Sequence, residues 1–85
     1  MKIKFSKKFV KEYRRLPAQI QDATDKQIKF LLADSEHPSL DKKKMNDPRN
    51  IWRIKINKSY RITFQIEKDY YILRRIGRHN IIERP

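Results

Sequence analysis

The segment that decides the fold is Ile51–Ile66, which reads IWRIKINKSYRITFQI. Successive side chains of a β-strand point to opposite faces, so alternating residue types are sorted onto the two faces. The segment alternates in this way twice, on either side of a short turn. One face of the predicted hairpin carries Trp52, Ile54, Ile56, Tyr60, Ile62, Phe64 and Ile66, and the other carries Arg53, Lys55, Arg61, Thr63 and Gln65. The sequence therefore predicts one face in a core and an opposite, open face that is cationic.

The chain is short, basic and free of cysteine. It has 85 residues, with 22 Lys and Arg against 10 Asp and Glu, and a net charge of +12. This length predicts a single domain over residues 1–85. Without cysteine, neither disulfides nor thiolate metal sites can stabilise it. No apolar run approaches the ~20 residues of a membrane span, and the N-terminus lacks the apolar part of a signal peptide. We expect a soluble, cytoplasmic protein that does not act on membranes.

The positive charge is concentrated in the strand-forming half of the chain. From Arg49 to Pro85 there are ten Lys and Arg and three Asp and Glu. Such a density of cations on strands is typical of proteins that bind nucleic acids. A membrane-binding protein would more often carry its cations on an amphipathic helix. An acidic protein partner could bind the same surface.

The remaining elements follow from periodicity and capping. Residues 1–5 read as a short strand, and Ser6 is a good N-cap for a helix to about Arg15. Pro17 fits the start of a second helix to about Asp34. The buried stripe expected on this helix comprises Ile20, Thr24, Ile28, Leu31 and Leu32. A basic, polar loop precedes the hairpin, and a third strand is expected from about Asp69 to Ile76, closed by Gly77.

The order β-α-α-β-β-β predicts an α+β fold. We expect an antiparallel sheet with a two-helix hairpin packed on its apolar face, because the strands bracket the helices in sequence. The other face of the sheet would be left open.

The sequence resembles the RelE/ParE toxin superfamily over nearly its whole length. The stretch Trp52–Lys55, a short turn and Tyr60–Phe64 are similar to the central hairpin of that family. The opening Lys-Phe-Ser-Lys-Lys-Phe-x-Lys-Glu-Tyr-x-x-Leu-Pro (residues 4–17) resembles the first strand and helix, and Ile76–His79 resembles the closing strand and glycine. The resemblance implies a RelE-like fold and the toxin of a type II toxin-antitoxin system, with a small acidic antitoxin as its partner.

The RelE-like branch of this family cleaves mRNA, generally on the ribosome and without a metal. By resemblance, Arg53 and Lys55 occupy two basic positions of the second strand, and Arg61 matches the arginine after the hairpin tyrosine. His79 falls near the basic or histidine position after the glycine. RelE-like nucleases often carry a tyrosine a few residues further on, whereas residues 81–85 contain none.

The chemistry of RNA cleavage selects the same residues. Attack of the 2′-hydroxyl on the adjacent phosphate needs positioned cations for the added charge and a group that transfers protons near ambient pH. Arg53, Lys55 and Arg61 are the candidate phosphate-binding catalytic residues, and His79, with a reference pKa of ~6.5, is the candidate proton-transfer group. Glu83 could act as a base or orient His79. Lys42, Lys43, Lys44 and Arg75 are candidates for RNA binding.

Two alternatives to an endoribonuclease stay open at this point. A ParE-like toxin would inhibit DNA gyrase without cleaving RNA, and an inactive relative would only bind antitoxin or RNA. The missing tyrosine favours these alternatives, whereas the cationic face favours cleavage of ribosome-bound mRNA. No metal-ligand spacing or nucleotide-binding motif occurs in the sequence, so we expect no metal and no small-molecule cofactor.

Overall fold

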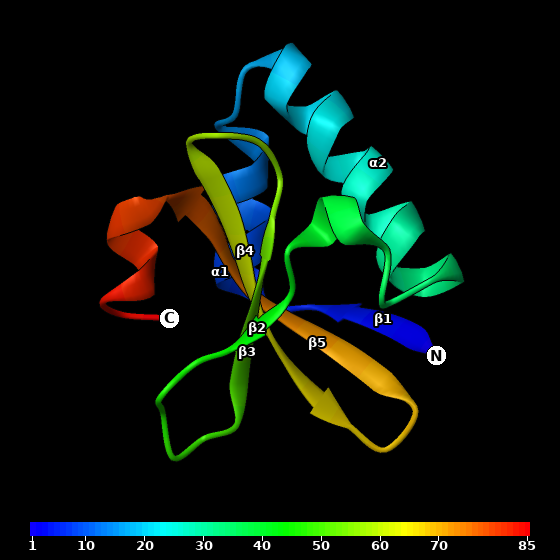
Figure 1. Ribbon diagram of the computed structural model, residues 1–85. Helices are drawn as coiled ribbons and strands as arrows, with labels where there is room; N and C mark the ends of the chain where they lie inside the picture. The colour runs from blue at the N-terminus through cyan, green and yellow to red at the C-terminus, as the bar shows by residue number, and fades with distance from the viewer.

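The predicted hairpin lies at the centre of a five-stranded sheet (Figure 1). The structure is a computed structural model that describes residues 1–85. In chain order the strands are β1 (Lys2–Phe5), β2 (Lys43–Lys44), β3 (Ile51–Lys55), β4 (Tyr60–Glu67) and β5 (Tyr70–Arg78). In space they follow the order β1-β5-β4-β3-β2. Strands β3, β4 and β5 form the expected antiparallel meander, which fixes the cationic residues of the hairpin on one face.

The sheet is mixed rather than antiparallel throughout, which corrects the prediction. Strand β1 runs parallel to β5, with Lys2 opposite Tyr70 and Phe5 opposite Leu73. The β3–β4–β5 meander fixes the direction of β5. Strand β1 pairs with the other edge of β5, and since no tight turn joins β1 to β5, their pairing does not have to be antiparallel. The predicted basic loop also contains a strand, because β2 pairs antiparallel with β3. Two short 3₁₀ helices, η1 (Pro38–Leu40) and η2 (His79–Ile82), complete the chain.

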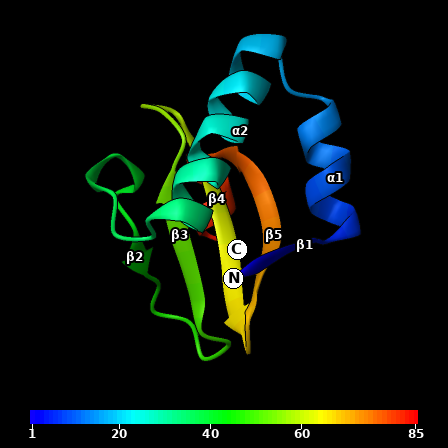
Figure 2. The same cartoon turned by 90° about the vertical axis from the view of Figure 1, so that its right-hand side faces the viewer.

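Both α-helices lie on the same side of the sheet. Figure 2 shows α2 (Ala18–Ala33) in front of β3 and β4, and α1 (Lys7–Arg14) beside β5. The expected N-cap of α1 is confirmed, because the Ser6 hydroxyl accepts a hydrogen bond from the Phe9 N–H at 3.0 Å. Pro17 precedes α2 as its capping residue. Neither helix combines the length and hydrophobicity that crossing a bilayer requires.

The core fills the space between the helices and the sheet. The apolar face of the hairpin is confirmed, with Trp52 and Tyr60 only partly buried at its margin. Ile66, near the end of β4, is 43% exposed and corrects the prediction for that position. The cluster of buried hydrophobic residues comprises Phe9, Leu31, Leu40, Ile54, Ile56, Ile62, Phe64, Tyr71, Leu73 and Ile76.

The buried stripe of α2 differs from the expected one at its C-terminal end. Thr24 and Leu31 are buried as predicted, whereas Leu32 is 44% exposed. Gln27 is buried instead, and its amide donates to the carbonyl oxygens of Ser39 (3.1 Å) and Lys55 (2.8 Å). A buried amide is tolerated because its donors are satisfied, and here it joins α2 to the end of β3.

Strand β5 contains an irregularity that alternation alone cannot predict. Thr63 pairs with Arg75 but Phe64 pairs with Leu73, so Arg74 is an extra residue in β5. Such a β-bulge shifts the faces of the residues on either side of it. Gly77, expected to close the strand, instead lies within it.

Candidate functional site

Three cations of the hairpin share the sheet face opposite the helices, which we call the cationic face. Lys55 lies directly opposite Arg61 across β3 and β4, and Arg53 lies opposite Thr63. Directly opposed residues on antiparallel strands have neighbouring side chains on the same face. The structure therefore brings Arg53, Lys55 and Arg61 together, and all three are half-buried.

Arg61 is held by the backbone of the hairpin turn. Its Nη1 donates to the carbonyl oxygens of Asn57 at 2.6 Å and Tyr60 at 2.9 Å. The turn is itself fixed, because the Asn57 side-chain oxygen accepts from the N–H groups of Ser59 and Tyr60, each at 2.9 Å. Neutral acceptors orient the guanidinium without neutralising it. The remaining N–H groups of Arg61 are thus presented in a defined orientation with the full charge retained.

None of the three cations has an acidic partner. The four salt bridges of the molecule join Lys42 to Glu36, Lys43 to Asp41, Arg49 to Asp47 and Arg75 to Glu12. Since like charges on neighbouring strands repel, placing Lys55 opposite Arg61 is unfavourable for the folded state alone. A bound anion would relieve that repulsion.

The C-terminal residues 79–85, which we call the tail, cover part of the cationic face that we expected to be open. Ile81 in η2 is 1% exposed, and Thr63 beneath the tail is fully buried although it lies on this face. Gly77 makes this packing possible, because a Cβ atom there would lie 2.8 Å from Cγ2 of Ile81. Arg74 Nε also donates to the Pro85 carbonyl oxygen at 3.2 Å. The tail thus packs on the sheet (Figure 1).

His79 and Glu83 lie at the two ends of the 3₁₀ helix η2. Gly77 pairs with Arg61 and Arg78 with Tyr60, so His79 follows β5 at the end of the sheet where Arg61 lies. Glu83 instead lines a hollow beside Arg74 and Arg84. Both acid–base candidates are exposed. The register therefore groups His79, rather than Glu83, with the cations of the hairpin.

Arg75 has a role in the fold that the sequence did not indicate. Its Nη2 lies 2.7 Å from Oε2 of Glu12 in α1, and its Nη1 donates to the Arg84 carbonyl oxygen at 3.0 Å. Glu12 also accepts a hydrogen bond from the Ile76 N–H at 3.3 Å, beyond the point where β1 stops pairing with β5. Glu12, Arg75 and Arg84 thereby connect the helix, the sheet and the tail. A single acid in the otherwise basic helix α1 is the sequence signal that could have indicated this.

The lysines before the hairpin are divided by strand β2. Lys43 pairs with Arg53 and extends the cationic face, whereas Lys44 pairs with Trp52. The ammonium of Lys42 lies 2.7 Å from Oε1 of Glu36 and 5.5 Å from the centre of the Trp52 ring. Of the three lysines, only Lys43 lies by register beside the hairpin cations.

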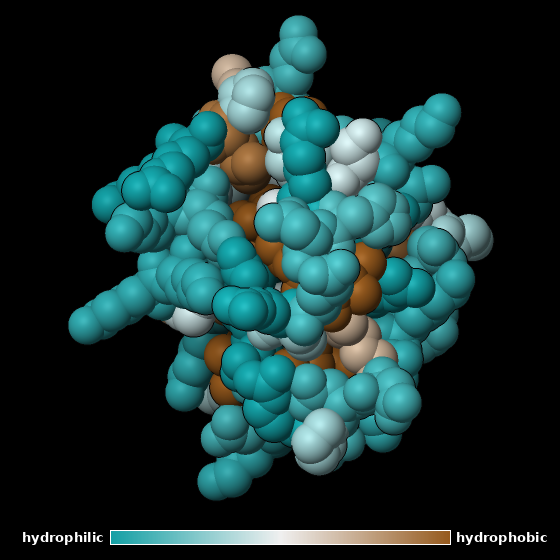
Figure 3. All heavy atoms as spheres, turned by 90° about the vertical axis from the view of Figure 1, so that its left-hand side faces the viewer, coloured by the Kyte–Doolittle hydropathy of each residue, from teal (hydrophilic) through white to brown (hydrophobic).

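Hydrophilic side chains dominate this side of the molecule. Figure 3 shows the side that carries the tail, where hydrophobic atoms are visible only in small areas between polar ones. One polar atom beneath this surface lacks a partner, namely the buried Oγ1 of Thr63. Buried hydroxyls usually form hydrogen bonds, so the hydroxyl of Thr63, on the cationic face, is an exception.

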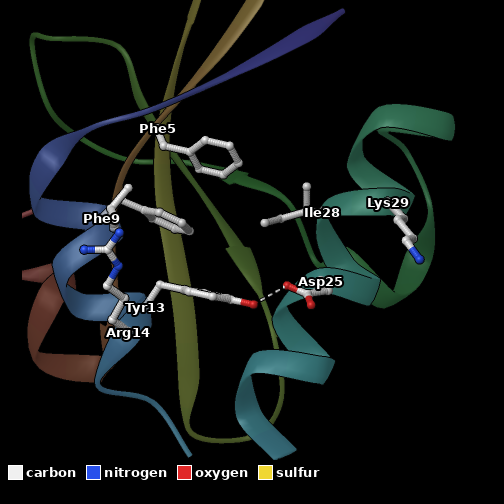
Figure 4. A pocket seen from close by; sticks show the side chains of 8 residues that line it. Phe5, Phe9, Tyr13, Arg14, Asp25, Ile28 and Lys29 are labelled. Atoms are coloured by element: carbon white, nitrogen blue, oxygen red, sulfur yellow. Dashed lines mark hydrogen bonds between the residues drawn. The ribbon is translucent and has the colours of Figure 1, made fainter. Parts of the chain in front are cut away.

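A second hollow, which we call the apolar groove, lies between the two helices on the other side of the molecule. It has a volume of about 520 Å³, and Figure 4 shows Phe5, Phe9 and Ile28 facing one another across it. Tyr13 donates to Oδ1 of Asp25 at 2.7 Å and so joins α1 to α2. This hydrogen bond raises the pKa of Tyr13, because it stabilises the protonated hydroxyl beside a carboxylate. Phe5 is 53% exposed at the mouth of the groove.

Comparisons with known proteins identify relatives over almost the whole chain. The family described as the ParE toxin of the type II toxin-antitoxin system parDE matches residues 3–82. Toxin RelE3 of Methanocaldococcus jannaschii is 32% identical over 82 residues, which cover 89% of this chain and 88% of the relative. The family match includes the hairpin, Gly77 and residues 79–82 of the tail.

Solved structures show the same arrangement of helices and strands. A chain of the RelB-RelE antitoxin-toxin complex from Methanococcus jannaschii has 27% identity and a TM-score of 0.75, with 94% of each chain covered. The YoeB/ParE toxin from Agrobacterium tumefaciens has a TM-score of 0.78 and 11% identity, covering 93% of this chain and 99% of that one. At such low identity, the second likeness shows the fold alone.

Proposed function

Because the chain belongs to the RelE/ParE superfamily of toxins of type II toxin-antitoxin systems, we propose that it acts by cleaving mRNA as an endoribonuclease. The observation that carries this proposal is the group of Arg53, Lys55 and Arg61, which share one sheet face without an acidic partner. Cations held in a fixed orientation by neutral acceptors suit the stabilisation of charge on a phosphate.

The proposed reaction is a phosphodiester transfer within the RNA strand. The 2′-hydroxyl oxygen attacks the adjacent phosphorus and loses its proton to a base, while the bond from phosphorus to the 5′-oxygen breaks and that oxygen receives a proton. The products are a cyclic phosphate and a free 5′-hydroxyl. Arg61, with Arg53 and Lys55, stabilises the additional negative charge on the phosphate. This scheme needs no metal ion and no small-molecule cofactor.

His79 is the proposed proton-transfer residue. It is exposed and lies at the Arg61 end of the sheet, whereas Glu83 lies beside a different group of cations. A histidine fits the task because its reference pKa of ~6.5 lets it both accept and donate a proton near neutrality. Glu83 is the second residue to test, in the role of a base or of an orienting group for His79.

The test is cleavage of a translated mRNA followed by primer extension. We expect defined cuts after adding the purified protein to a translation reaction, no cuts on the same mRNA without ribosomes, and no cuts with Arg61→Ala. Intact mRNA under all conditions would contradict the proposal.

The alternative is a toxin that binds a protein target such as DNA gyrase, or an inactive relative that only binds antitoxin or RNA. Two observations favour it: the family description names ParE, and the tail contains no tyrosine. Halted DNA replication with intact mRNA after induced expression would support the gyrase target. Loss of toxicity in Arg61→Ala together with loss of mRNA cuts would support the nuclease.

We also propose a small acidic antitoxin as the partner, with an amphipathic helix bound in the apolar groove. Its lining includes Phe9 and Ile28, with Phe5 at its mouth and the charged residues Arg14 and Lys29. An apolar helix face would pack on the apolar residues and acidic side chains would meet the cations. Structures of RelB-RelE complexes support an antitoxin partner for related toxins.

The partner proposal is tested by measuring antitoxin affinity for Phe5→Ser. We expect a loss of about ten- to a hundredfold, the amount expected when a phenylalanine no longer becomes buried. Leu32→Ser is the matched control, because Leu32 is similarly exposed on α2 but does not line the groove. Equal losses for the two variants would contradict binding in the groove.

A further inference from the structure

A second group of cations lines a hollow at the end of the tail, which we call the tail groove. Its volume is about 520 Å³, and it lies between the start of α1, strand β5 and the last residues of the chain. Its charged lining comprises Lys8, Arg49, Arg74, Arg75, Glu83 and Arg84. The tail groove lies away from Arg53, Lys55 and Arg61, none of which lines it.

The tail groove retains positive charge after all its ion pairs are counted. Arg49 is bound by Asp47 and Arg75 by Glu12, so these two cations are compensated. Lys8, Arg74 and Arg84 have no acidic partner in the structure. Glu83 is the one acid in the lining. Three uncompensated cations and one acid make the hollow attractive to an anion.

The groove is held in shape by hydrogen bonds. Arg74 donates from Nη1 to Oε1 of Gln65 at 3.0 Å and from Nε to the main-chain oxygen of Pro85 at 3.2 Å. Ser6 donates from its hydroxyl to the Arg74 carbonyl oxygen at 2.7 Å. The amide oxygen of Gln65 orients the guanidinium of Arg74 without cancelling its charge, as backbone carbonyl oxygens do for Arg61. Preorganised donors bind phosphates with little additional ordering cost.

The residues that line the tail groove favour a nucleic acid over an acidic protein as its ligand. Ile72 is its one hydrophobic residue, whereas the apolar groove has five. Protein segments gain most of their affinity from apolar side chains buried in a pocket, and the tail groove offers no such floor. A nucleic-acid backbone needs phosphate contacts alone for binding without sequence preference.

Arg49 connects the tail groove to the strand that carries two of the hairpin cations. It lines the groove and lies two residues before β3, the strand of Arg53 and Lys55, and its carbonyl oxygen accepts from Gln65 on β4 at 2.9 Å. A ligand strand bound at Arg53 and Lys55 would therefore reach Arg74 and Lys8 by passing Arg49.

We propose that the tail groove binds the phosphate backbone of the RNA strand on one side of the cleavage site. This inference rests on the proposed function and adds a binding subsite to it. Lys8 and Arg84 contact phosphates at the edges of the groove, and Arg74 contacts one at its centre. The groove recognises the backbone rather than bases, because its charged donors match phosphate oxygens.

The test is the salt dependence of RNA affinity for Lys8→Gln/Arg84→Gln. The probe is a single-stranded RNA dodecamer with 2′-O-methyl groups, which cannot be cut by attack of a 2′-hydroxyl. Each phosphate contact contributes a slope of ~0.7 in a plot of log affinity against log salt. We expect the slope of the double variant to fall by about 1.4, which is twice the contribution of a single phosphate contact.

Two matched controls separate the groove from general charge. Lys8→Arg/Arg84→Lys keeps both charges and should keep the wild-type slope. Lys26→Gln/Lys29→Gln removes the same charge from α2, on the other side of the sheet, and should also leave the slope unchanged. A slope that falls equally in the Lys26 and Lys29 variant would overturn the proposal, and so would an unchanged slope in the Lys8 and Arg84 variant.

Further outcomes distinguish this inference from the proposed function. Normal RNA binding with a loss of antitoxin affinity in Lys8→Gln/Arg84→Gln would make the groove a protein-binding site and overturn the proposal. Wild-type protein that binds the probe through the groove but never cuts mRNA would overturn the ribonuclease and support the groove. Wild-type protein that does not bind the probe at low salt would overturn the groove proposal, whereas the ribonuclease is decided separately by the cuts in the translation reaction.

Discussion

The two sides of the sheet are covered in different ways. On the helix side, α1 and α2 bury a continuous apolar core against β3, β4 and β5. On the other side, the short tail packs with Ile81 and is held by hydrogen bonds from Arg74 and Arg75 to the carbonyl oxygens of Pro85 and Arg84. The first cover is made by hydrophobic burial and the second largely by arginines bonded to backbone oxygens.

This difference shows how a small protein can keep a basic surface ordered and charged at once. A carboxylate partner would order an arginine but cancel its charge. A carbonyl oxygen orders the arginine by accepting from one of its five N–H groups, and it leaves the charge of the guanidinium intact. Arg61 follows the second route, and the side-chain amide oxygen of Gln65 acts in the same way on Arg74. The comparison predicts that substitutions of core residues on the helix side change stability and that those of the cations on the tail side change activity.

The largest expected effect is on activity, from His79→Ala. If His79 transfers the proton, cleavage should slow by about two to four orders of magnitude, the usual contribution of general acid–base catalysis. His79→Gln should be equally slow, because glutamine can form hydrogen bonds but cannot carry the proton. The measurement is the rate of mRNA cleavage in a translation reaction, with thermal unfolding as the control for folding. A rate close to that of the wild type would assign proton transfer elsewhere, with Glu83→Gln as the next variant.

Arg61→Ala should slow cleavage by roughly two to three orders of magnitude, as expected when a group that stabilises transition-state charge is removed. Its melting temperature should change little, because Arg61 lies outside the apolar core and removing it relieves repulsion with Lys55. Single-turnover cleavage rates and thermal unfolding provide the two readouts. A variant that unfolds at a much lower temperature would show that the hydrogen bonds from Arg61 to Asn57 and Tyr60 stabilise the fold.

Ile62→Ala sharpens the comparison, because Ile62 follows Arg61 in sequence but points to the other face. It is fully buried in the core, so the substitution should destabilise the fold by about 2–5 kcal/mol. Unfolding in urea measures this, and cleavage should be assayed at a temperature where the variant stays folded. A variant of wild-type stability would mean that the helix side is packed too loosely to support the comparison.

Gly77→Ala tests how closely the tail is fitted to the sheet. The added Cβ atom would meet Cγ2 of Ile81 at 2.8 Å, so the tail must shift, at a cost of about 1–3 kcal/mol. Combining it with Ile81→Val should recover part of this loss, because the smaller side chain makes room. Urea unfolding of the single and double variants measures their coupling. Strictly additive losses would contradict a direct contact between these residues.

The smallest expected effect concerns the pH dependence of stability at Asp47. The hydrogen bonds from Arg49 lower the pKa of Asp47 to about 2. A lowered pKa favours the folded state above the usual pKa of the carboxyl group, and this contribution is lost as the pH falls toward 2. Asp47→Asn should therefore be slightly less stable than wild type at neutral pH, and the difference should vanish in acid. Parallel unfolding curves at neutral and acidic pH provide the measurement, and a constant difference would argue against the ion pair.

The sequence by itself determined the hairpin, the two helices and the grouping of cations. Alternation placed Arg53, Lys55 and Arg61 on one face because the period of a strand is two residues, and Ser6 marked the start of α1 through its hydroxyl. These features depend on near neighbours in the chain. The resemblance to the family likewise rested on local motifs.

The tertiary structure decided what depends on contacts between distant residues. The parallel pairing of β1 with β5, the bulge at Arg74 and the course of the tail over Thr63 follow from how the elements meet. The pairing of Glu12 with Arg75 joins residues far apart in sequence, and no local pattern encodes it. For the same reason the sequence could not determine whether Glu83 lies near His79, and the tertiary structure places it in the lining of the tail groove together with Arg74.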